Sequence, residues 1–424
     1  MIRERALVCW AHLYLLLTFR WWYATPHSFS VEGLDSLRAL PVWGLESLPR
    51  LPLSGVTALL EVAAVGSLLG ALLSTRTDTL EQARRLLWPL LCIKLYLYLL
   101  DLRLFTTYHH MHLLMAVLIA GGASLLLLRL GLLQIYLFSA LGKFNDSWLQ
   151  GAYFKSIDNG LPLLGTSSSL LTAAAWAVIL LELFGPILWF LPWERWRRGS
   201  VILFLGFHLY SGLIVGFRYP LLMLPLCYLL LWPLHKPAHK GYRFNQHDLS
   251  AWLLLSITFL FGWLPFFLPS DTRYTAEGRY FSIGNMFDAN RRTYFQATLY
   301  RESTPYVLRV ERSYPAHNFY DASTTVLLSR SGQPFQHLKD SWEWEGKTVV
   351  NPAYFQETHL RTIGDPYLYL YFLKQASSRL DADRLEAELE SSLNRGAERT
   401  VFEIKGSPEQ LPIYSPWGGN EWLP

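Results

Sequence analysis

Runs of apolar residues, each close in length to a membrane-spanning helix, constrain this chain more than any other feature. Three of the clearest are Leu86 to Leu100, Val201 to Val215 and Trp252 to Leu268. About 20 apolar residues in a helix span a hydrocarbon core roughly 30 Å thick. A helix on the surface of a soluble protein alternates between an apolar and a polar face, and these runs do not. They predict an integral membrane protein.

The apolar residues are concentrated before residue 270. Hydrophobic residues make up 51% of the 424 positions and charged residues only 17%, yet the sequence after Pro269 is polar with scattered aromatic residues. This change predicts two domains. The first, 1–269, is an all-α polytopic transmembrane bundle, and the second, 270–424, is a mixed α+β domain rich in strands.

Nine membrane-spanning segments can be placed before residue 270. The first, Ala6 to Tyr23, follows Arg3 and Arg5 but precedes no small-residue cleavage site, so we predict a retained helix rather than a signal peptide. The nine predicted spans are 6–24, 54–73, 86–104, 110–128, 131–144, 170–191, 201–216, 219–234 and 251–268.

The distribution of basic residues predicts the orientation of the bundle. With a cytoplasmic N-terminus, the cytoplasmic segments carry most of the Lys and Arg residues, among them Arg3, Arg84, Arg85, Arg195 and Lys236. Positive residues favour the cytoplasmic side, and nine spans then place the second domain outside the cytoplasm. We expect a bacterial inner-membrane protein. The net charge of +4 is small and scattered, which argues against a nucleic-acid partner.

The second domain shows strand patterns followed by a helical one. Thr304 to Arg312 and Thr324 to Leu328 read as short strands, and Thr400 to Ile404 as a last strand. We predict a helix over Asp365 to Asn394, because leucines recur there at spacings of four or five residues with charged residues between them.

Ionisable residues inside the predicted spans cost about 2.5–3.5 kcal/mol each, so each requires a partner or a function. Lys94, Tyr98 and Asp101 share one face of the third span. Lys94 and Asp101 are expected to neutralise charges on other helices, such as Glu61 or Arg20. Glu182 lies four residues before Pro186 and is expected to support a helix break or hold a cation.

Histidines and cysteines offer further candidates. Tyr108, His109, His110 and His112 open the fourth span, either as catalytic groups or ligands or as residues that face lipid headgroups. Their spacing suits a metal poorly, and no metal is expected. The three cysteines lie in apolar segments without metal or CxxC spacing, which predicts inert thiols.

The segment Tyr136 to Gly151, YLFSALGKFNDSWLQG, is the most informative in the chain. An apolar helix there runs into a single lysine, Lys143, and then into a polar turn before Trp148. Lysine at a helix end commonly extends to the membrane interface. In a dry pocket, desolvation would instead make Lys143 a usable base.

These motifs, in this order, resemble the HTTM family of membrane proteins, which includes the vitamin K-dependent gamma-glutamyl carboxylases and their bacterial relatives. Ala140 to Phe144, with Trp148 and Gly151, resembles the carboxylase motif A-G-x-K-K-L-D-x-D-W-x-x-G. His110 with Leu113 resembles the Asn-His-x-x-Leu start of the preceding helix. Further similarities lie at Gln134 with Tyr136, Phe207-His208 with Phe217 and Met223, Phe281 to Phe287, Asp365-Pro366, Glu409-Gln410 and Tyr414 to Pro416.

The resemblance implies a site and a chemistry. Lys143 would be the base that deprotonates a vitamin K-type hydroquinone such as menaquinol, and His110 would assist by stabilising anionic oxygen. Cofactor-binding residues would be His112, Tyr136, Trp148 and His208. The reaction would use O₂ and CO₂ for epoxidation or gamma-carboxylation, with membrane lipid and an extracytoplasmic peptide or envelope protein as partners.

The sequence also departs from the family pattern. The lysine pair is reduced to Gly142-Lys143, and the acidic turn becomes Asn145-Asp146-Ser147. Two other functions therefore stay open. One is a non-enzymatic scaffold that keeps the carboxylase-like fold and binds a partner through its second domain. The other is a transporter that uses Lys94, Asp101 and Glu182, although no inverted repeat is evident.

Overall fold

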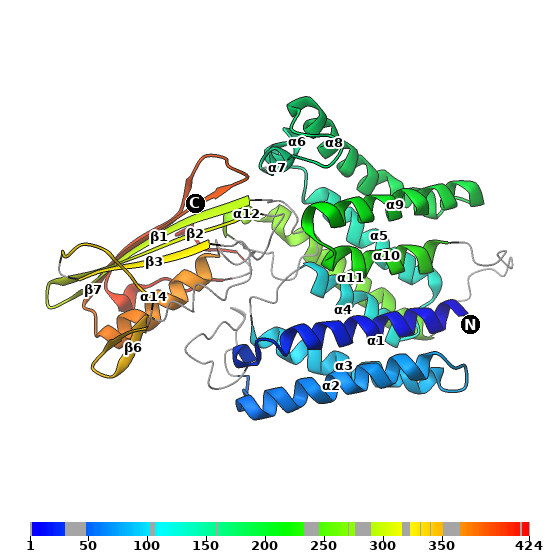
Figure 1. The fold of residues 1–424 in the computed structure, drawn as a ribbon, viewed down its shortest axis with the longest axis horizontal. Coiled ribbons are helices and arrows are strands. Elements are labelled where there is room, and N and C mark those ends of the chain that lie inside the picture. The colour runs from blue at the N-terminus through cyan, green and yellow to red at the C-terminus, as the bar shows by residue number, and fades with distance from the viewer. Residues whose placement is uncertain are drawn as a thin grey trace.

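A helical bundle is joined end to end with a sheet domain (Figure 1). Strands follow the helices in the chain, and the change falls between Thr275 and Asn290, just after the predicted boundary at residue 270. The structure is a computed structural model that describes residues 2–29, 48–101, 107–157, 160–232, 246–269, 271–275, 290–315, 323–330, 332–339, 341–350, 365–415 and 418–423.

Each of the nine predicted spans overlaps a helix in the described part of the bundle, although the bounds differ and the span 110–128 runs past the end of α4 into α5. The helices are α1 (Ile2–Trp22), α2 (Leu53–Ser74), α3 (Leu80–Leu100), α4 (Thr107–Ala120), α5 (Leu125–Leu141), α8 (Ser168–Phe184, continued by the 3-10 turn η5, Gly185–Trp189), α9 (Glu194–Val215), α10 (Arg218–Leu231) and α11 (Gln246–Phe267). Shorter elements are η1 (Pro26–Phe29), α6 (Asp146–Leu149), α7 (Ala152–Lys155) and α12 (Thr272–Thr275).

Only some of these helices could cross a membrane on their own. Among the described residues, three are both long and apolar enough: Leu53–Ser74, Ser168–Trp189 and Asp248–Phe267. The count of nine transmembrane helices is therefore not reached by length and composition. Helices α4 and α10 have 14 residues each, and α1, α3 and α9 carry several charged residues in their first two turns.

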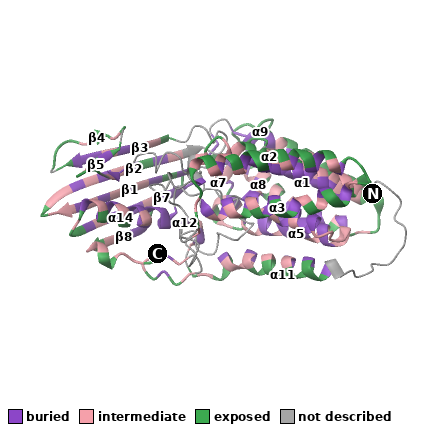
Figure 2. Ribbon diagram, turned by 90° about the horizontal axis from the view of Figure 1, so that it is seen from below, coloured by how far each residue is buried: buried purple, intermediate pink, exposed green. Residues whose placement is uncertain are grey.

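Large apolar side chains are exposed on the outside of the bundle. On α2, Val62 and Val65 are each 67% exposed, and on α11 Leu260 is 69% exposed. Figure 2 shows how much of α11 is exposed. Contact of many such apolar side chains with water is unfavourable, whereas their contact with lipid is favourable. The surface agrees with an association of the bundle with a membrane.

Helix α5 lies inside the bundle. It packs against α4, α8, α10 and α11, while α9 packs against α10 and η5. Polar residues on the inner side of α5 are thus surrounded by helices on several sides. This arrangement positions the site described below.

The sheet domain is built on six antiparallel strands in the order β4-β3-β2-β1-β7-β8. They are β1 (Asn290–Arg301), β2 (Thr304–Pro315), β3 (Ser323–Arg330), β4 (Gln336–His337), β7 (Arg384–Leu393) and β8 (Arg399–Gly406). A separate hairpin pairs β5 (Trp342–Trp344) with β6 (Lys347–Val350), and η7 is a short turn at Pro408–Gln410.

Helix α14 (Pro366–Leu380) packs against the sheet and closes its core. Phe295 of the central strand β1 is fully buried, with its ring 4.7 Å from that of Tyr369 on α14. On both neighbouring strands the residues opposite Phe295 are apolar, Val310 and Leu389. Aromatic contacts of this kind dominate such a core.

The prediction of one helix over Asp365 to Asn394 is wrong. The helix ends at Leu380, where Asp381 adopts a left-handed conformation, and β7 follows. Leu385 and Leu389 are four residues apart, but Ala387 between them is also buried. Buried residues at every second position are typical of a strand.

Three predicted strands are confirmed as parts of β2, β3 and β8. They are Thr304 to Arg312, Thr324 to Leu328 and Thr400 to Ile404. The motif Phe281 to Phe287 and residue Pro416 lie outside the described residues.

The sheet domain touches the bundle directly beside the turn that follows Lys143. Asn394, just after β7, donates a hydrogen bond from Nδ2 to Oγ of Ser147 in α6, at 2.6 Å. Nearby, Asp271 accepts hydrogen bonds from Arg273 at 2.6 Å and from Arg399 of β8 at 3.3 Å. These bonds join the two domains where the chain leaves the bundle.

We expect this junction to loosen in acid. Burial by itself would raise the pKa of Asp271, but the hydrogen bonds and charge of Arg273, with the charge of Arg399, hold it below its ordinary value of 3.8. A depressed folded-state pKa gives a stability contribution that is complete above the unfolded pKa and is lost as the pH falls through the folded-state value. The loss should therefore occur below about pH 4. Tryptophan-monitored thermal unfolding between pH 5 and pH 3 should show a smaller decrease in Asp271→Asn than in the wild type. Equal decreases would contradict this role of Asp271.

Candidate functional site

Helix α5 and the turn after it place three polar residues inside the bundle. Tyr136, Ser139 and Lys143 follow one another at spacings of three and four residues, which puts them on one side of the helix. All three are buried. The Lys143 ammonium donates to Oγ of Ser139 at 2.7 Å and to its carbonyl oxygen at 3.1 Å. Lys143 thus folds back along α5 instead of extending to the membrane interface.

Lys143 is paired with a carboxylate. Its Nζ forms an ion pair with Oε2 of Glu182 on α8, and the two side chains are only 3% and 2% exposed. The Trp148 ring lies on the ammonium, with its centroid 5.3 Å from Nζ. Glu182 stands just before Gly185, where α8 changes to a 3-10 turn, so it lies near a helix break and holds a cation. Lys143 and Glu182 are separate candidates in the sequence, and the structure joins them.

A second group of polar side chains lies alongside. The Tyr136 hydroxyl forms a hydrogen bond with Nε2 of His208 on α9 and contacts Sγ of Cys227 on α10 at 3.2 Å. All three residues are fully buried. Trp189 and Phe204 pack on the Tyr136 ring. Cys227 is a free thiol, as predicted, but it belongs to this polar group.

The two groups are joined through α5 into one unit. Tyr136, which bonds to His208, stands one turn before Ser139, which bonds to Lys143. The unit is called the Lys143 cluster below, and it consists of Tyr136, Ser139, Lys143, Trp148, Glu182, His208 and Cys227.

Two buried nitrogen atoms of the Lys143 cluster lack hydrogen-bond partners in the described part of the chain. They are Nδ1 of His208 and Nε1 of Trp148. Buried polar groups in proteins are nearly always hydrogen-bonded, so each exception requires an explanation. A ligand or a water molecule that bonds to these atoms would supply one.

The histidines of α4 belong to a different cluster. His112 Nδ1 and Lys94 Nζ lie 2.9 Å apart, and the His112 ring stacks on Tyr14 with a centroid distance of 4.7 Å. His110 Nε2 bonds to the Tyr98 hydroxyl at 2.9 Å. The Lys94 cluster, as these five residues are called below, is built from α1, α3 and α4.

Four of the six predicted site residues are therefore together, and two are elsewhere. Tyr136, Lys143, Trp148 and His208 share the Lys143 cluster, whereas His112 contacts Lys94 and His110 bonds to Tyr98. Glu61, the expected partner of Lys94, instead accepts a hydrogen bond from Tyr23 at 2.9 Å. Sequence reasoning missed Ser139 and Cys227, because neither a serine nor a cysteine in an apolar run carries a signal of its own.

Within the described residues, no group of three His, Cys, Asp or Glu side chains is placed to hold a metal ion. The sequence matches no family model, no curated protein and no solved structure. The resemblance to the HTTM family therefore rests on the motifs alone, and the geometry of the site carries the functional inference.

Proposed function

We propose that this chain is a multi-pass membrane enzyme of the HTTM type, in which the Lys143 cluster accepts a proton from a lipid-soluble quinol. Under this proposal the N-terminus is cytoplasmic and the sheet domain lies on the outer face of a bacterial inner membrane. The observation that carries it is the buried Lys143–Glu182 ion pair beside the hydrogen-bonded Tyr136–His208 pair.

A purely structural role accounts poorly for this cluster. Each charged side chain inside a membrane helix costs about 2.5–3.5 kcal/mol, and a buried ion pair is often no more stabilising than apolar residues of the same volume. Five further polar or aromatic side chains surround the pair. Intramembrane ionisable residues of this kind commonly mark functional sites.

The residues of the cluster fit a phenolic ligand. Nε2 of His208 is engaged by Tyr136, so Nδ1 faces a ligand as a donor in one neutral tautomer and as an acceptor in the other. Nε1 of Trp148 can donate to an oxygen. When bound, a quinol would supply the electrons that reduce O₂, and the family resemblance adds CO₂ as the group transferred to a glutamate.

The Lys143–Glu182 pair can take up a proton from a bound ligand, and the positive charge that the pair then carries is offset by the ligand oxygen that lost the proton. The ammonium–carboxylate and amine–carboxylic acid forms contain the same number of protons, and either form can accept one more to give an ammonium and a carboxylic acid. A hydroxyl proton that reaches the pair is therefore retained, and its positive charge lies beside the oxygen that lost it. Ser139 holds the ammonium in place through two hydrogen bonds.

The position of the sheet domain suggests where a peptide substrate would enter. The domain contacts Ser147 in the turn between Lys143 and Trp148. A peptide bound by the sheet domain would arrive at the end of α5 that carries the cluster. Quinol would reach the same cluster from the lipid.

A quinol turnover assay tests the proposal. Purified protein in liposomes is given vitamin K hydroquinone or menaquinol with O₂ and bicarbonate, and the epoxide is measured by mass spectrometry. His208→Gln should lose at least about tenfold in rate, because it removes the nitrogen that faces the ligand. His337→Gln, on the exposed strand β4, is the matched control and should keep the wild-type rate.

Two results would contradict the proposal. One is wild-type protein that turns over neither quinol, and the other is equal rates in His208→Gln and the control. Wild-type protein that lacks turnover but retains a partner through residues 290–423 would favour the scaffold function instead.

A further inference from the structure

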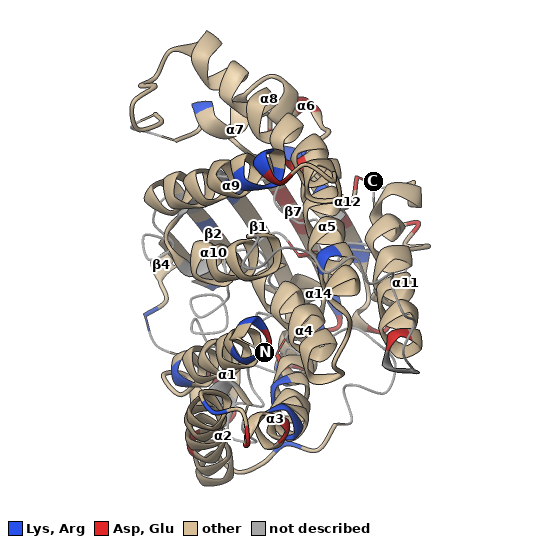
Figure 3. Cartoon of the chain, turned by 90° about the vertical axis from the view of Figure 1, so that its right-hand side faces the viewer, with Lys and Arg blue, Asp and Glu red and all other residues tan. Residues whose placement is uncertain are grey.

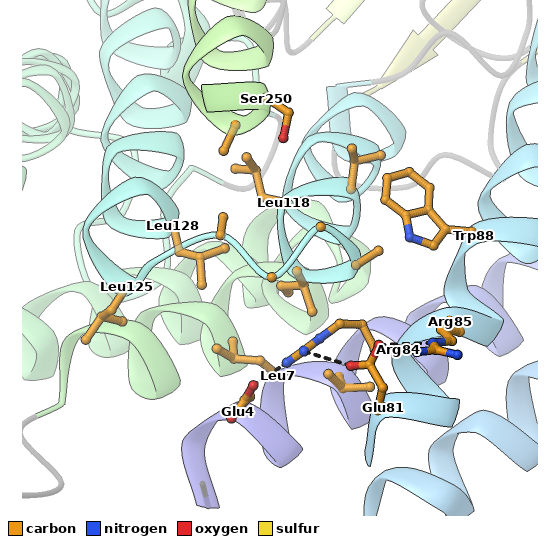
Figure 4. Close-up of a pocket in the computed structure, with 18 of the residues that line it drawn as sticks. Glu4, Leu7, Glu81, Arg84, Arg85, Trp88, Leu118, Leu125, Leu128 and Ser250 are labelled. Carbon is orange, nitrogen blue, oxygen red and sulfur yellow. Dashed lines mark hydrogen bonds and ion pairs between the residues drawn. The ribbon is translucent and has the colours of Figure 1, made fainter. Parts of the chain in front are cut away.

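A cavity of about 960 Å³, drawn in Figure 4, lies beside the start of α1, at the end of the bundle away from the sheet domain (Figure 1). Its walls come from α1, α3, α11, the end of α4, the start of α5 and the turn between these two helices. One side is apolar, with Leu118 and Leu128, and the other carries the ion pairs of Arg84 with Glu4 and Glu81. A volume of this size is typical of sites for small molecules and lipids.

The turn between α4 and α5 opens the cavity because it carries almost no side chains. Gly121 and Gly122 both line the cavity. Gly122 has φ +68°, and a Cβ there would point toward Nη1 of Arg84 at 3.9 Å. A left-handed conformation favours glycine, so the turn and the open space have the same origin.

Three arginines meet beside this cavity. Arg3, which also lines the cavity, donates from Nη2 to the carbonyl oxygen of Trp232 at 2.8 Å, and Arg129 donates from Nε to that of Leu230 at 2.9 Å. Arg197 lies in the first turn of α9, where the next residue, Arg198, stands over the Trp232 ring with its Cζ 5.9 Å from the ring centroid. We call Arg3, Arg129 and Arg197 the arginine triad. Figure 3 looks onto this end of the bundle, where basic residues are visible on α1, α3 and α9.

The positive charge of the triad is not balanced by carboxylates in the described part of the chain. Glu4 and Glu81 pair with Arg84, and Glu194 pairs with Arg198. The Nε atoms of Arg3 and Arg197 are buried and have no hydrogen-bond partner among the described residues. The carbonyl groups at the C-terminus of α10 offset part of the charge but cannot use all fifteen N–H donors of three guanidinium groups.

We propose that the cavity and the arginine triad together bind one anionic phospholipid, with its phosphate on the triad and an acyl chain along Leu118 and Leu128. Guanidinium groups bind phosphate oxygens with good geometry, and basic pockets between membrane helices select anionic headgroups. The apolar wall distinguishes a lipid from a free phosphate. This inference rests on the proposed membrane location of the bundle and not on the chemistry of Lys143.

Binding of phosphatidylglycerol to the full-length protein in detergent, measured by native mass spectrometry, tests the site. Phosphatidylglycerol should bind at least about tenfold more tightly than phosphatidylcholine. Each arginine removed should weaken its binding about fivefold, so Arg3→Gln with Arg197→Gln should remove most of the preference. Arg76→Gln with Arg195→Gln removes two exposed arginines from the same end of the bundle and should leave the preference unchanged.

A second pair of variants tests the cavity itself. Ser250→Trp fills the space from α11, whereas Leu249→Trp adds the same side chain at a neighbouring position that is 67% exposed. Only the first should weaken phosphatidylglycerol binding. Three results would overturn the proposal: equal binding of the two lipids, equal losses in the triad and control variants, or glycerol phosphate alone binding as tightly as phosphatidylglycerol. If quinol turnover is absent but lipid selectivity persists, the proposed enzyme function is contradicted and the lipid site still stands.

Discussion

Replacing Lys143 by Met or Glu182 by Leu is expected to destabilise the protein by about 3–5 kcal/mol in either single variant, whereas the double variant should be close to the wild type. Each single replacement leaves one buried charge without its partner, in a site where the two side chains are 3% and 2% exposed. The double replacement removes both charges and fills the volume with apolar atoms. Thermal unfolding in detergent, at one lipid and salt composition, measures all four proteins.

The double variant separates a structural pair from a catalytic one. If the pair handles protons, Lys143→Met with Glu182→Leu should fold normally yet lose quinol turnover by at least about 100-fold. Glu194→Leu with Arg198→Met removes an exposed ion pair from α9 and serves as the control, with an expected change below about 1 kcal/mol. Full turnover in the stable double variant would show that the cluster only holds the helices together.

The helices of the bundle were predictable because the sequence pattern that defines them is local. An apolar run of about 20 residues predicts a helix whatever lies around it. The sheet domain was harder because leucine spacings of four suit both a helix and a strand when the intermediate positions are small. Ala387, between Leu385 and Leu389, is buried as well, and this burial at every second position is what identifies the segment as a strand. Strand β1 was not among the predicted strands, and its pairing with β7, which lies far along the chain, is a contact that no local pattern shows.

The candidate site was predictable in part for the same reason. Tyr136, Lys143 and Trp148 lie in one short segment, and their shared site follows from one helix and one turn. Glu182 comes from another helix, 39 residues after Lys143, and no local pattern encodes the ion pair. The prediction that His110 lies beside Lys143 follows from the order of the family's motifs, but motif order along the chain does not determine which residues meet in space. In the structure His110 bonds to Tyr98 instead.

Replacement of the second buried lysine, Lys94, should stabilise the protein, whereas replacement of Lys143 should destabilise it. Lys94 is fully buried, and its partners are His112 Nδ1 at 2.9 Å and the Tyr14 ring at 5.6 Å. No carboxylate among the described residues lies within ion-pair distance of it. Lys94→Met keeps the volume and removes the desolvation cost, so we expect stabilisation by about 1–3 kcal/mol. Leu95→Met, at the neighbouring position that is 46% exposed, controls for the effect of a methionine in α3.

His112→Leu should have the reverse effect, because it leaves the Lys94 amine without a hydrogen-bond partner in a dry environment. A loss of about 1–3 kcal/mol is expected, and Lys94→Met in the same protein should recover it. Both effects are read from thermal unfolding in detergent. A decrease in stability for Lys94→Met would contradict the cost assigned to this lysine. A costly side chain persists in a fold only where it has a use. Stabilisation by Lys94→Met accompanied by lost quinol turnover would therefore place a second functional residue in α3, beside the histidines of α4.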